Sequence, residues 1–130
     1  KIYILARGTT ALIARDFEFQ LQLLGYNAFV LSDSQIMRNS KKLFKENDIV
    51  MIFTLKNSTP ELEMSAKFAK EVGATVITCC CIQGTSLEKY SDLSILGGRK
   101  KNNSMIEEFN VMSRLPLHII ARTLIDYLTL

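Results

Sequence analysis

Residues 49–62, IVMIFTLKNSTPEL, constrain the fold of this chain more than any other stretch. The first five are apolar without alternation, which is typical of a strand that is buried on both faces. A polar loop follows at 54–59, and Pro60 suits the first turn of a helix because its missing N–H would have no partner there. Amides, hydroxyls and one lysine then lie at the positive end of a helix dipole. The stretch therefore predicts a strand, a loop that binds an anion such as phosphate, and a helix.

The start of this helix can be capped in two ways. Thr59 is a good N-cap, because its hydroxyl can accept a hydrogen bond from a first-turn amide. Ser58 with Glu61 instead matches a capping box, in which each side chain bonds the backbone of the other residue. The sequence leaves both possibilities open.

Strands and helices alternate along the whole chain. We expect strands at 1–6, 27–31, 48–53, 74–80 and 92–96. Helices are expected between Thr10 and Gly25, at 36–45, at 60–72, and from about 113 to the end, with at most a short helix at 84–90. This alternation predicts a three-layer αβα domain of the α/β class, with a five-stranded parallel sheet and right-handed crossovers. For five strands the flavodoxin-like order 2-1-3-4-5 is the first choice.

Helical spacing also predicts which side chains face the sheet, because apolar positions recur at helical intervals. These positions are Ile13, Phe17, Leu21 and Leu24 in the first helix, Ile36, Ser40, Leu43 and Phe44 in the second, and Leu62, Ala66 and Ala69 in the third.

In this strand order, strands 1 and 3 are neighbours and the topological switch point lies between them. The two loops richest in small hydroxylated residues, 8–10 and 54–59, follow these two strands. Ligands of open α/β sheets bind beyond the carboxyl ends of the strands at such a point. We therefore expect one ligand site between the two loops. The alternative is that both loops merely cap their helices.

Composition limits the other possibilities. With 130 residues, 48% of them hydrophobic, the chain suits one domain and not two. The net charge is only +3, and the one dense basic run, Arg99-Lys100-Lys101, has the neighbours of a surface loop, so nucleic-acid binding is disfavoured. No apolar run is long enough to span a membrane and no signal peptide is visible, so we expect a soluble cytoplasmic protein without a membrane partner. Because the chain starts inside a predicted strand and without Met, we expect a further domain upstream.

The three cysteines are consecutive, Cys79-Cys80-Cys81. Neighbours on a strand point to opposite faces, so this run matches neither a CxxC metal site nor a disulfide framework. Buried strand thiols are favoured over a redox role. We expect no metal and no cofactor.

The two loops resemble the motifs of a known family, the SIS (sugar isomerase) phosphosugar-binding domains, and within it the RpiR-type bacterial transcriptional regulators. The family pattern G-x-G-x-S after strand 1 stands here as ARGTT, which includes Gly8, Thr9 and Thr10. The pattern S-x-S-G-x-T stands as TLKNST, which gives the ligand-binding candidates Thr54, Lys56, Asn57, Ser58 and Thr59. The resemblance extends to residues 66–77, to Leu87 with Asp92, and to Ser113-Arg114, so it covers nearly the whole chain.

Two departures from the family pattern affect the ligand site. Lys56 stands where the family has a hydroxyl that holds phosphate, and Asn57 stands where it has a glycine. Lys56 could supply a charge to the same phosphate, and Asn57 is one of the few residues that tolerate positive φ. The resemblance thus implies a site that is either retuned or lost.

The resemblance also implies a function. RpiR-type regulators use the SIS domain as a dimerising sensor of a sugar phosphate and bind DNA through an N-terminal helix-turn-helix domain, which is absent from this chain. The first hypothesis is therefore an effector-sensing homodimer without catalytic residues. The second is an aldose-ketose phosphosugar isomerase, with Glu107, Glu108 and His118 as candidate bases. The third is a dimerisation domain whose site has decayed. By the same resemblance, Glu107, Glu108 and Arg114 are candidates to close the ligand site across the dimer.

The final helix predicts a dimer interface. Its apolar residues cover more than one stripe, so packing on the sheet would leave an apolar face for a second subunit. The alternative is a helix buried within its own domain. The residues concerned are Leu115, Leu117, Ile119, Ile120, Ala121, Leu124, Ile125, Tyr127 and Leu128.

Overall fold

The computed structural model describes residues 1–56, 59–98 and 113–130. Five strands form one sheet: β1 (Ile2–Leu5), β2 (Ala28–Leu31), β3 (Ile49–Phe53), β4 (Thr75–Cys80) and β5 (Leu93–Leu96). All neighbouring strands are parallel, and the order is β2-β1-β3-β4-β5. The predicted α/β class and strand order are therefore confirmed.

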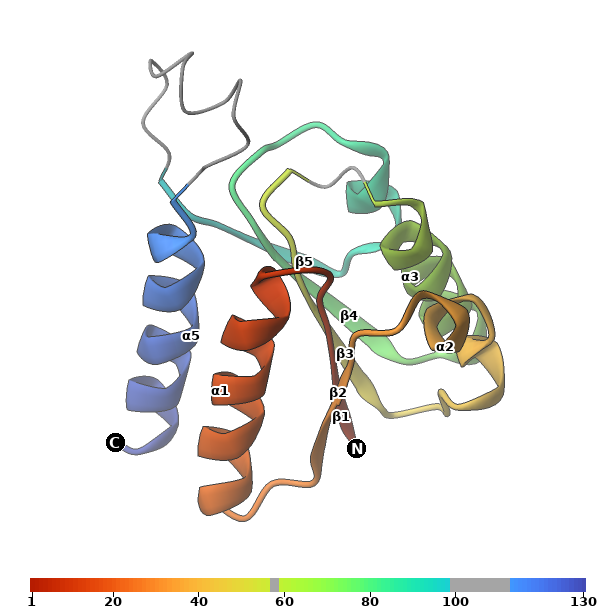
Figure 1. Ribbon diagram of the computed structural model, residues 1–130. Coiled ribbons are helices and arrows are strands. Elements are labelled where there is room, and N and C mark those ends of the chain that lie inside the picture. Colours follow the sequence, from red (N-terminus) through yellow and green to blue (C-terminus); the bar gives the residue numbers. More distant parts are fainter. Residues whose placement is uncertain (57–58, 99–112) are drawn as a thin grey trace.

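Helices cover both faces of the sheet (Figure 1). On one face lie α1 (Thr10–Leu23) and α5 (Leu115–Leu128). On the other lie α2 (Ser34–Arg38), the 3-10 turns η1 (Ser40–Lys42) and η2 (Ser86–Tyr90), and α3 (Pro60–Val72). Within the described part of the chain, none of these helices combines the length and the apolar character that a membrane crossing requires.

Each face has its own hydrophobic core, because successive strand residues point to opposite sides. Ile4, Met51 and Phe53 point toward α1 and α5, and Phe53 meets Phe17 of α1 edge to face with 5.5 Å between ring centroids. Leu5, Val50 and Ile52 point toward α2 and α3. The central strand β3 is buried on both sides, as its unbroken apolar run predicted.

The predicted helix at 60–72 has the same bounds as α3, and its three predicted inward residues, Leu62, Ala66 and Ala69, are buried. Gly73 then ends it with φ +88, a left-handed conformation that glycine adopts without strain. Because the start of α3 follows the loop after β3, this helix directs its positive dipole end at the carboxyl edge of the sheet.

The predicted helix at 36–45 is wrong. Asp33 caps a helix that starts earlier, since its Oδ1 accepts from the backbone amides of Gln35 and Ile36 at 2.8 and 3.0 Å. Asn39 ends α2 after five residues, and its Nδ2 donates to the carbonyl of Gln35 at 2.9 Å. Met37 is buried in this helix, whereas Ile36, which was expected to face inward, is 45% exposed.

Other differences are smaller. Leu43 and Leu24, predicted to face inward, are each 40% exposed, whereas Ser40 and Phe44 are buried as predicted. The final helix begins at Leu115 and not at Ser113. Strands β1, β2, β3, β4 and β5 are each shorter by one or two residues than predicted.

The three cysteines are all buried, and no disulfide joins them within the described residues. Burial raises the pKa of the Cys79 thiol to about 12, and the neighbouring Cys80 adds to the shift. A thiol with such a pKa is almost entirely protonated near neutral pH and is a poor nucleophile. The prediction of buried strand thiols is therefore confirmed.

Candidate functional site

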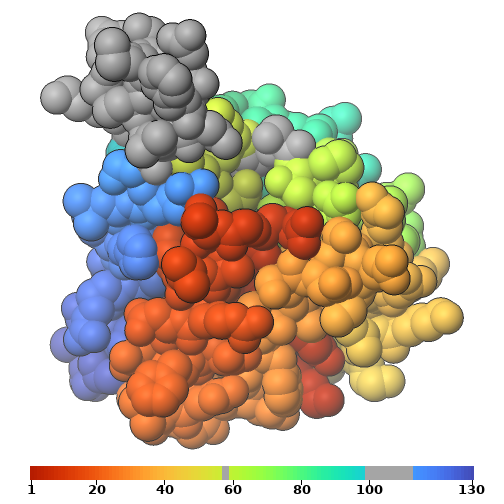
Figure 2. Space-filling view, viewed as in Figure 1, coloured from red at the N-terminus to blue at the C-terminus, as the bar shows by residue number. Residues whose placement is uncertain are grey.

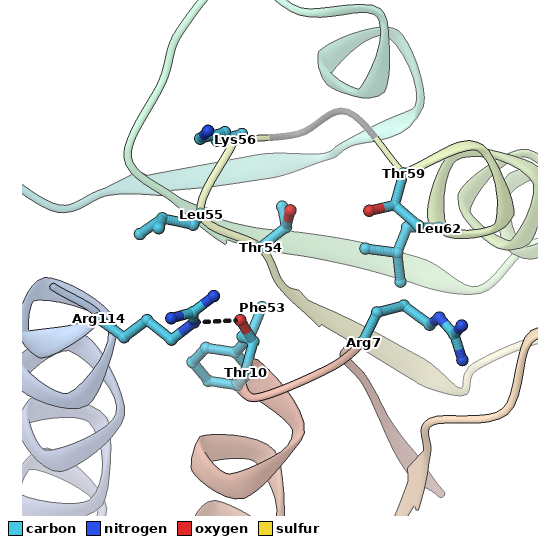
Figure 3. Close-up of a pocket in the computed structure, with 9 residues that line it drawn as sticks. All are labelled: Arg7, Thr10, Phe53, Thr54, Leu55, Lys56, Thr59, Leu62 and Arg114. Atoms are coloured by element: carbon cyan, nitrogen blue, oxygen red, sulfur yellow. Dashed lines mark hydrogen bonds between the residues drawn. The ribbon is translucent and has the colours of Figure 1, made fainter. Parts of the chain in front are cut away.

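A pocket of about 220 Å³ opens at the carboxyl edge of β1 and β3, where the sequence predicted a crevice (Figure 3). The loop after β1, the loop after β3, the start of α3 and the residue before α5 each contribute to its wall. The described lining residues are Arg7, Thr10, Phe53, Thr54, Leu55, Lys56, Thr59, Leu62 and Arg114.

The β1 side of the pocket depends on a tight turn. Gly8 adopts φ +59, which is costly for residues with a Cβ, and its carbonyl accepts from the amide of Ala11 at 3.1 Å. This turn starts α1 at Thr10, whose side chain is buried and lines the pocket. Thr10 Oγ1 accepts a hydrogen bond from Arg114 Nε at 3.1 Å, which joins the first and last helices of the chain at the pocket.

The β3 side of the pocket follows directly from the strand. The backbone amide of Thr54 donates to the carbonyl of Cys79 at 3.0 Å, so the chain remains tied to β4 just beyond the end of β3. Thr54 is buried and Lys56 is half-buried, and both line the pocket. The predicted anion-binding loop therefore contributes one hydroxyl and one ammonium to the wall.

Thr59, one of the two capping possibilities that the sequence left open, is the N-cap residue of α3, but its hydroxyl accepts no bond from the helix. The carboxylate of Glu61 instead accepts from its own backbone amide and from Arg38 Nη2, 2.9 Å away, and these two bonds hold its pKa below the usual range. The hydroxyl of Thr59 lines the pocket (Figure 3). The Ser58 capping box lies outside the described residues.

The described wall of the pocket is cationic. Arg7, Lys56 and Arg114 line it together with three threonine hydroxyls, and no carboxylate is among the described lining residues. The positive end of the α3 dipole adds to this potential. Such a combination stabilises an anion, because charge-assisted hydrogen bonds from cations and helix amides are stronger than neutral ones.

The structure brings together five of the predicted site residues: Thr10, Thr54, Lys56, Thr59 and Arg114. It places Arg114 in the pocket of its own chain, whereas the prediction gave it a role across a dimer. Gly8 and Thr9 belong to the first loop but do not line the pocket. Asn57, Ser58, Glu107 and Glu108 lie outside the described residues.

Arg7 is the site residue that sequence reasoning missed. Its guanidinium Nη1 donates to the carbonyl of Ser32, just past the end of β2, at 2.7 Å. The signal in the sequence was its position, since it directly precedes the glycine of the first loop at the end of β1. The candidate base His118 is exposed on α5 and is not among the lining residues.

Among the described residues, no group of three or more His, Cys, Asp or Glu side chains is arranged to hold a metal ion. The hydroxyls and cations of the described wall can recognise an anion.

Solved structures with the same fold include the following three. The Vibrio vulnificus NanR protein, complexed with ManNAc-6P, matches with a TM-score of 0.83 and 17% identity over 98% of this chain and 48% of that one. The sugar isomerase domain of an RpiR transcription factor from Sphaerobacter thermophilus matches with a TM-score of 0.83 and 12% identity, over 97% and 68%. Protein MJ1247 of Methanococcus jannaschii, with an inferred function of 3-hexulose-6-phosphate isomerase, matches with a TM-score of 0.68 and 20% identity, over 99% and 71%.

Sequence comparison agrees with the fold. An uncharacterised protein of Aeropyrum pernix is 27% identical over 110 residues, which are 84% of this chain and 50% of that protein. The chain thus spans about half the length of this relative and of NanR. The family model of the SIS domain matches residues 1–113. The chain therefore belongs to the SIS domain family.

Proposed function

We propose that this chain is the effector-sensing, dimerising domain of a bacterial RpiR-type transcriptional regulator, and that its effector is a phosphorylated sugar. The observation that carries the proposal is the pocket at the start of α3, where Thr54, Lys56 and Thr59 meet Thr10 and Arg114. A phosphate group would accept hydrogen bonds from the hydroxyls and charge-assisted bonds from the cations. The sugar would extend from the phosphate across the carboxyl edge of the sheet.

Two proteins with the same fold support this proposal. NanR is complexed with a sugar phosphate, and the Sphaerobacter protein is a transcription factor. The proposal extends both properties to this chain. The cationic wall of the pocket suits the phosphate of such a ligand. The ammonium of Lys56 would bind this phosphate in place of the hydroxyl that the family pattern has at this position.

A thermal-shift screen tests the proposal. The panel contains hexose and pentose phosphates and amino-sugar phosphates, with the same sugars without phosphate as controls. A ligand at about 100 times its Kd adds about 2.7 kcal/mol to the free energy of unfolding, which raises Tm by several degrees. We expect at least one phosphorylated sugar to do so and its unphosphorylated control to leave Tm unchanged. Equal shifts with both members of every pair, or no shift with any, would contradict the proposal.

An exposed apolar surface supports the dimer. Helices α1 and α5 lie side by side, and Figure 2 shows their residues adjoining on one side of the molecule. Each helix exposes large apolar side chains there, among them Tyr127 at 74% and Leu12 at 69%. Isolated apolar residues are common on surfaces, but several large ones on two adjacent helices favour an interaction site. We call this set the α1/α5 surface: Leu12, Phe19, Leu23, Leu115, Ile119, Tyr127 and Leu128.

An aldose-ketose isomerase is the second candidate, favoured by the isomerase function inferred for MJ1247. An isomerase needs a general base within hydrogen-bond reach of the substrate carbon. Of its three candidate bases, Glu107 and Glu108 lie outside the described residues and His118 does not line the pocket, whose described wall offers hydroxyls and cations. We propose that the domain binds its ligand without turnover. Conversion of fructose 6-phosphate, glucosamine 6-phosphate or an arabinose phosphate, abolished by Glu107→Gln or Glu108→Gln, would instead establish the enzyme.

A further inference from the structure

Arg7 and Lys56 are two of the three positively charged residues in the described wall of the pocket, and the third, Arg114, donates to Thr10. Figure 3 shows them on different sides of the threonine hydroxyls: Lys56 extends from the loop after β3, and Arg7 extends from the end of β1 toward the α2 side. We take a phosphate at the start of α3 to accept hydrogen bonds from Thr54, Thr59 and the Lys56 ammonium, all of which line the pocket. The guanidinium of Arg7 lies on the other side of the Thr54 and Thr59 hydroxyls from Lys56, at a different part of the pocket rim.

The guanidinium of Arg7 is held in place before any ligand arrives. Its Nη1 donates to the Ser32 carbonyl at 2.7 Å, which fixes the end of a long side chain against the backbone after β2. Because a guanidinium has several N–H donors, this one bond leaves others for a ligand. A pre-positioned planar donor of this kind can bind a carboxylate or a phosphate in a bidentate manner.

The nearby acidic residue is already engaged by another arginine. Glu61, in the first turn of α3, forms an ion pair with Arg38 at 2.9 Å. Arg7 lies close enough to help lower the pKa of Glu61, although the Glu61 backbone amide and Arg38 have the larger effects. Among the described residues, Arg7 forms no ion pair. The charge of Arg7 therefore remains available at the rim of the pocket.

From this arrangement we infer that Arg7 is a specificity-determining residue for a second anionic group, so that the preferred effector is a sugar phosphate with an additional carboxylate or phosphate. The inference rests on the proposed function, because it assumes that one phosphate occupies the start of α3. A sugar with a single phosphate would occupy Lys56 and the hydroxyls and offer no anionic group of its own to Arg7. A ligand with a second anion would meet both charges.

Isothermal titration calorimetry tests this with two pairs of ligands that differ in one anionic group. Glucose 6-phosphate is compared with 6-phosphogluconate, and fructose 6-phosphate with fructose 1,6-bisphosphate. We expect the doubly anionic member of at least one pair to bind the wild-type chain about tenfold or more tightly than its partner, as one charge-assisted bond contributes at least this factor. Arg7→Gln should reduce the ratio to about twofold or less. Arg15→Gln removes the same charge from an exposed position of α1 outside the pocket and should leave the ratio unchanged.

The outcomes separate this inference from the proposed function. If singly and doubly anionic ligands bind the wild-type chain equally well, or if Arg7→Gln preserves the preference, the role of Arg7 is wrong while the phosphosugar site stands. If no phosphorylated ligand of either pair binds, and the wider panel of phosphosugars also fails, both are wrong. If Arg15→Gln lowers the ratio as much as Arg7→Gln, the preference comes from net charge, and the specific role of Arg7 is again wrong.

Discussion

At the scale of single residues, we expect phosphate binding to depend on the side chains of Lys56 and Thr59, which line the pocket. Lys56→Ala removes a charged donor, and Thr59→Val removes a hydroxyl at nearly constant volume. Loss of the charged donor should weaken phosphosugar binding by about 1.5–3 kcal/mol, or about ten- to 150-fold, and loss of the hydroxyl by about 0.5–1.5 kcal/mol. Calorimetric titration measures both effects.

Thr9→Val is the matched control for Thr59→Val. Thr9 is an exposed threonine of the first loop that does not line the pocket. Its replacement should leave the Kd unchanged. Wild-type affinity in both Lys56→Ala and Thr59→Val would show that the phosphate binds elsewhere.

Sequence reasoning located most of these residues but not their contacts. Thr10, Thr54 and Thr59 were predictable because small hydroxylated residues after strands 1 and 3 form a recognisable pattern. The position of Arg7 depends on the Ser32 carbonyl, and that of Arg114 on Thr10, which is 104 residues away in the chain. Contacts between residues this distant in sequence arise from the packing of whole elements, so local pattern contains no signal for them.

At the scale of elements, Gly97 determines how closely β5 approaches the start of α5. A Cβ at Gly97 would lie 2.8 Å from Cβ of Pro116, in the first turn of α5, and this proline ring cannot rotate away. Gly97→Ala should therefore destabilise the fold by about 1–3 kcal/mol through overpacking. It should also weaken ligand binding, because Arg114 directly precedes the displaced turn. Chemical denaturation and calorimetry measure the two effects.

Gly98→Ala provides the control within the same segment. Apart from its chain neighbours, no heavy atom of the described residues lies within 4 Å of a Cβ at Gly98, and its φ lies outside the left-handed region. This variant should be as stable as the wild type. If both alanine variants unfold at the wild-type denaturant concentration, close packing at Gly97 does not matter for stability.

Asp92 links three elements and should make stability depend on pH. Its carboxylate accepts one hydrogen bond from Lys70 of α3 and another, of 2.8 Å, from the backbone amide of Val76 in β4. Both bonds lower the pKa of Asp92, and Lys70 is the larger cause. A lowered pKa in the folded state stabilises the fold above the ordinary pKa of the carboxyl, near 3.8, and this contribution disappears as pH falls through the lower folded value. The stability difference between wild type and Asp92→Asn should therefore be largest near neutral pH and shrink below about pH 4. Urea titrations at several pH values measure it, and a constant difference across this range would contradict the assignment.

The sequence predicted elements well where their ends are marked by strong local signals and poorly where two signals compete. For α3, Pro60 and Gly73 define the two ends, and the predicted bounds were correct. For α2, the apolar spacing favoured a helix through Lys45, but the Asp33 cap and the Asn39 side chain impose an earlier start and an early end. Side-chain bonds to the backbone compete with helical continuation, and spacing alone does not reveal which prevails.

At the scale of the whole molecule, the strand order was predictable because alternating strands and helices with right-handed crossovers allow few topologies. The relation of α1 to α5 was not, since their contact joins the two ends of the chain. Together these helices expose the α1/α5 surface, which we expect to bury against a second subunit.

The dimer prediction can be measured by sedimentation velocity at micromolar concentration. The wild-type chain should sediment as a dimer, and Ile119→Glu, at a position that is 56% exposed on α5, should yield a folded monomer. Met64→Glu changes an exposed apolar residue of α3 on the opposite face of the sheet and should remain dimeric. A monomeric wild-type chain would contradict the proposed interface.

The most direct test of the central claim is to locate the ligand on the folded chain. Two-dimensional ¹H–¹⁵N NMR of the labelled chain is recorded during titration with the tightest-binding sugar phosphate of the panel. We predict that the backbone amides of Arg7, Thr10, Thr54, Leu55, Lys56, Thr59 and Leu62 shift, because these residues line the pocket at the carboxyl edge of β1 and β3. Shifts confined to the α1/α5 surface, or to the amino edge of the sheet, would contradict the assignment of this pocket as the phosphosugar site.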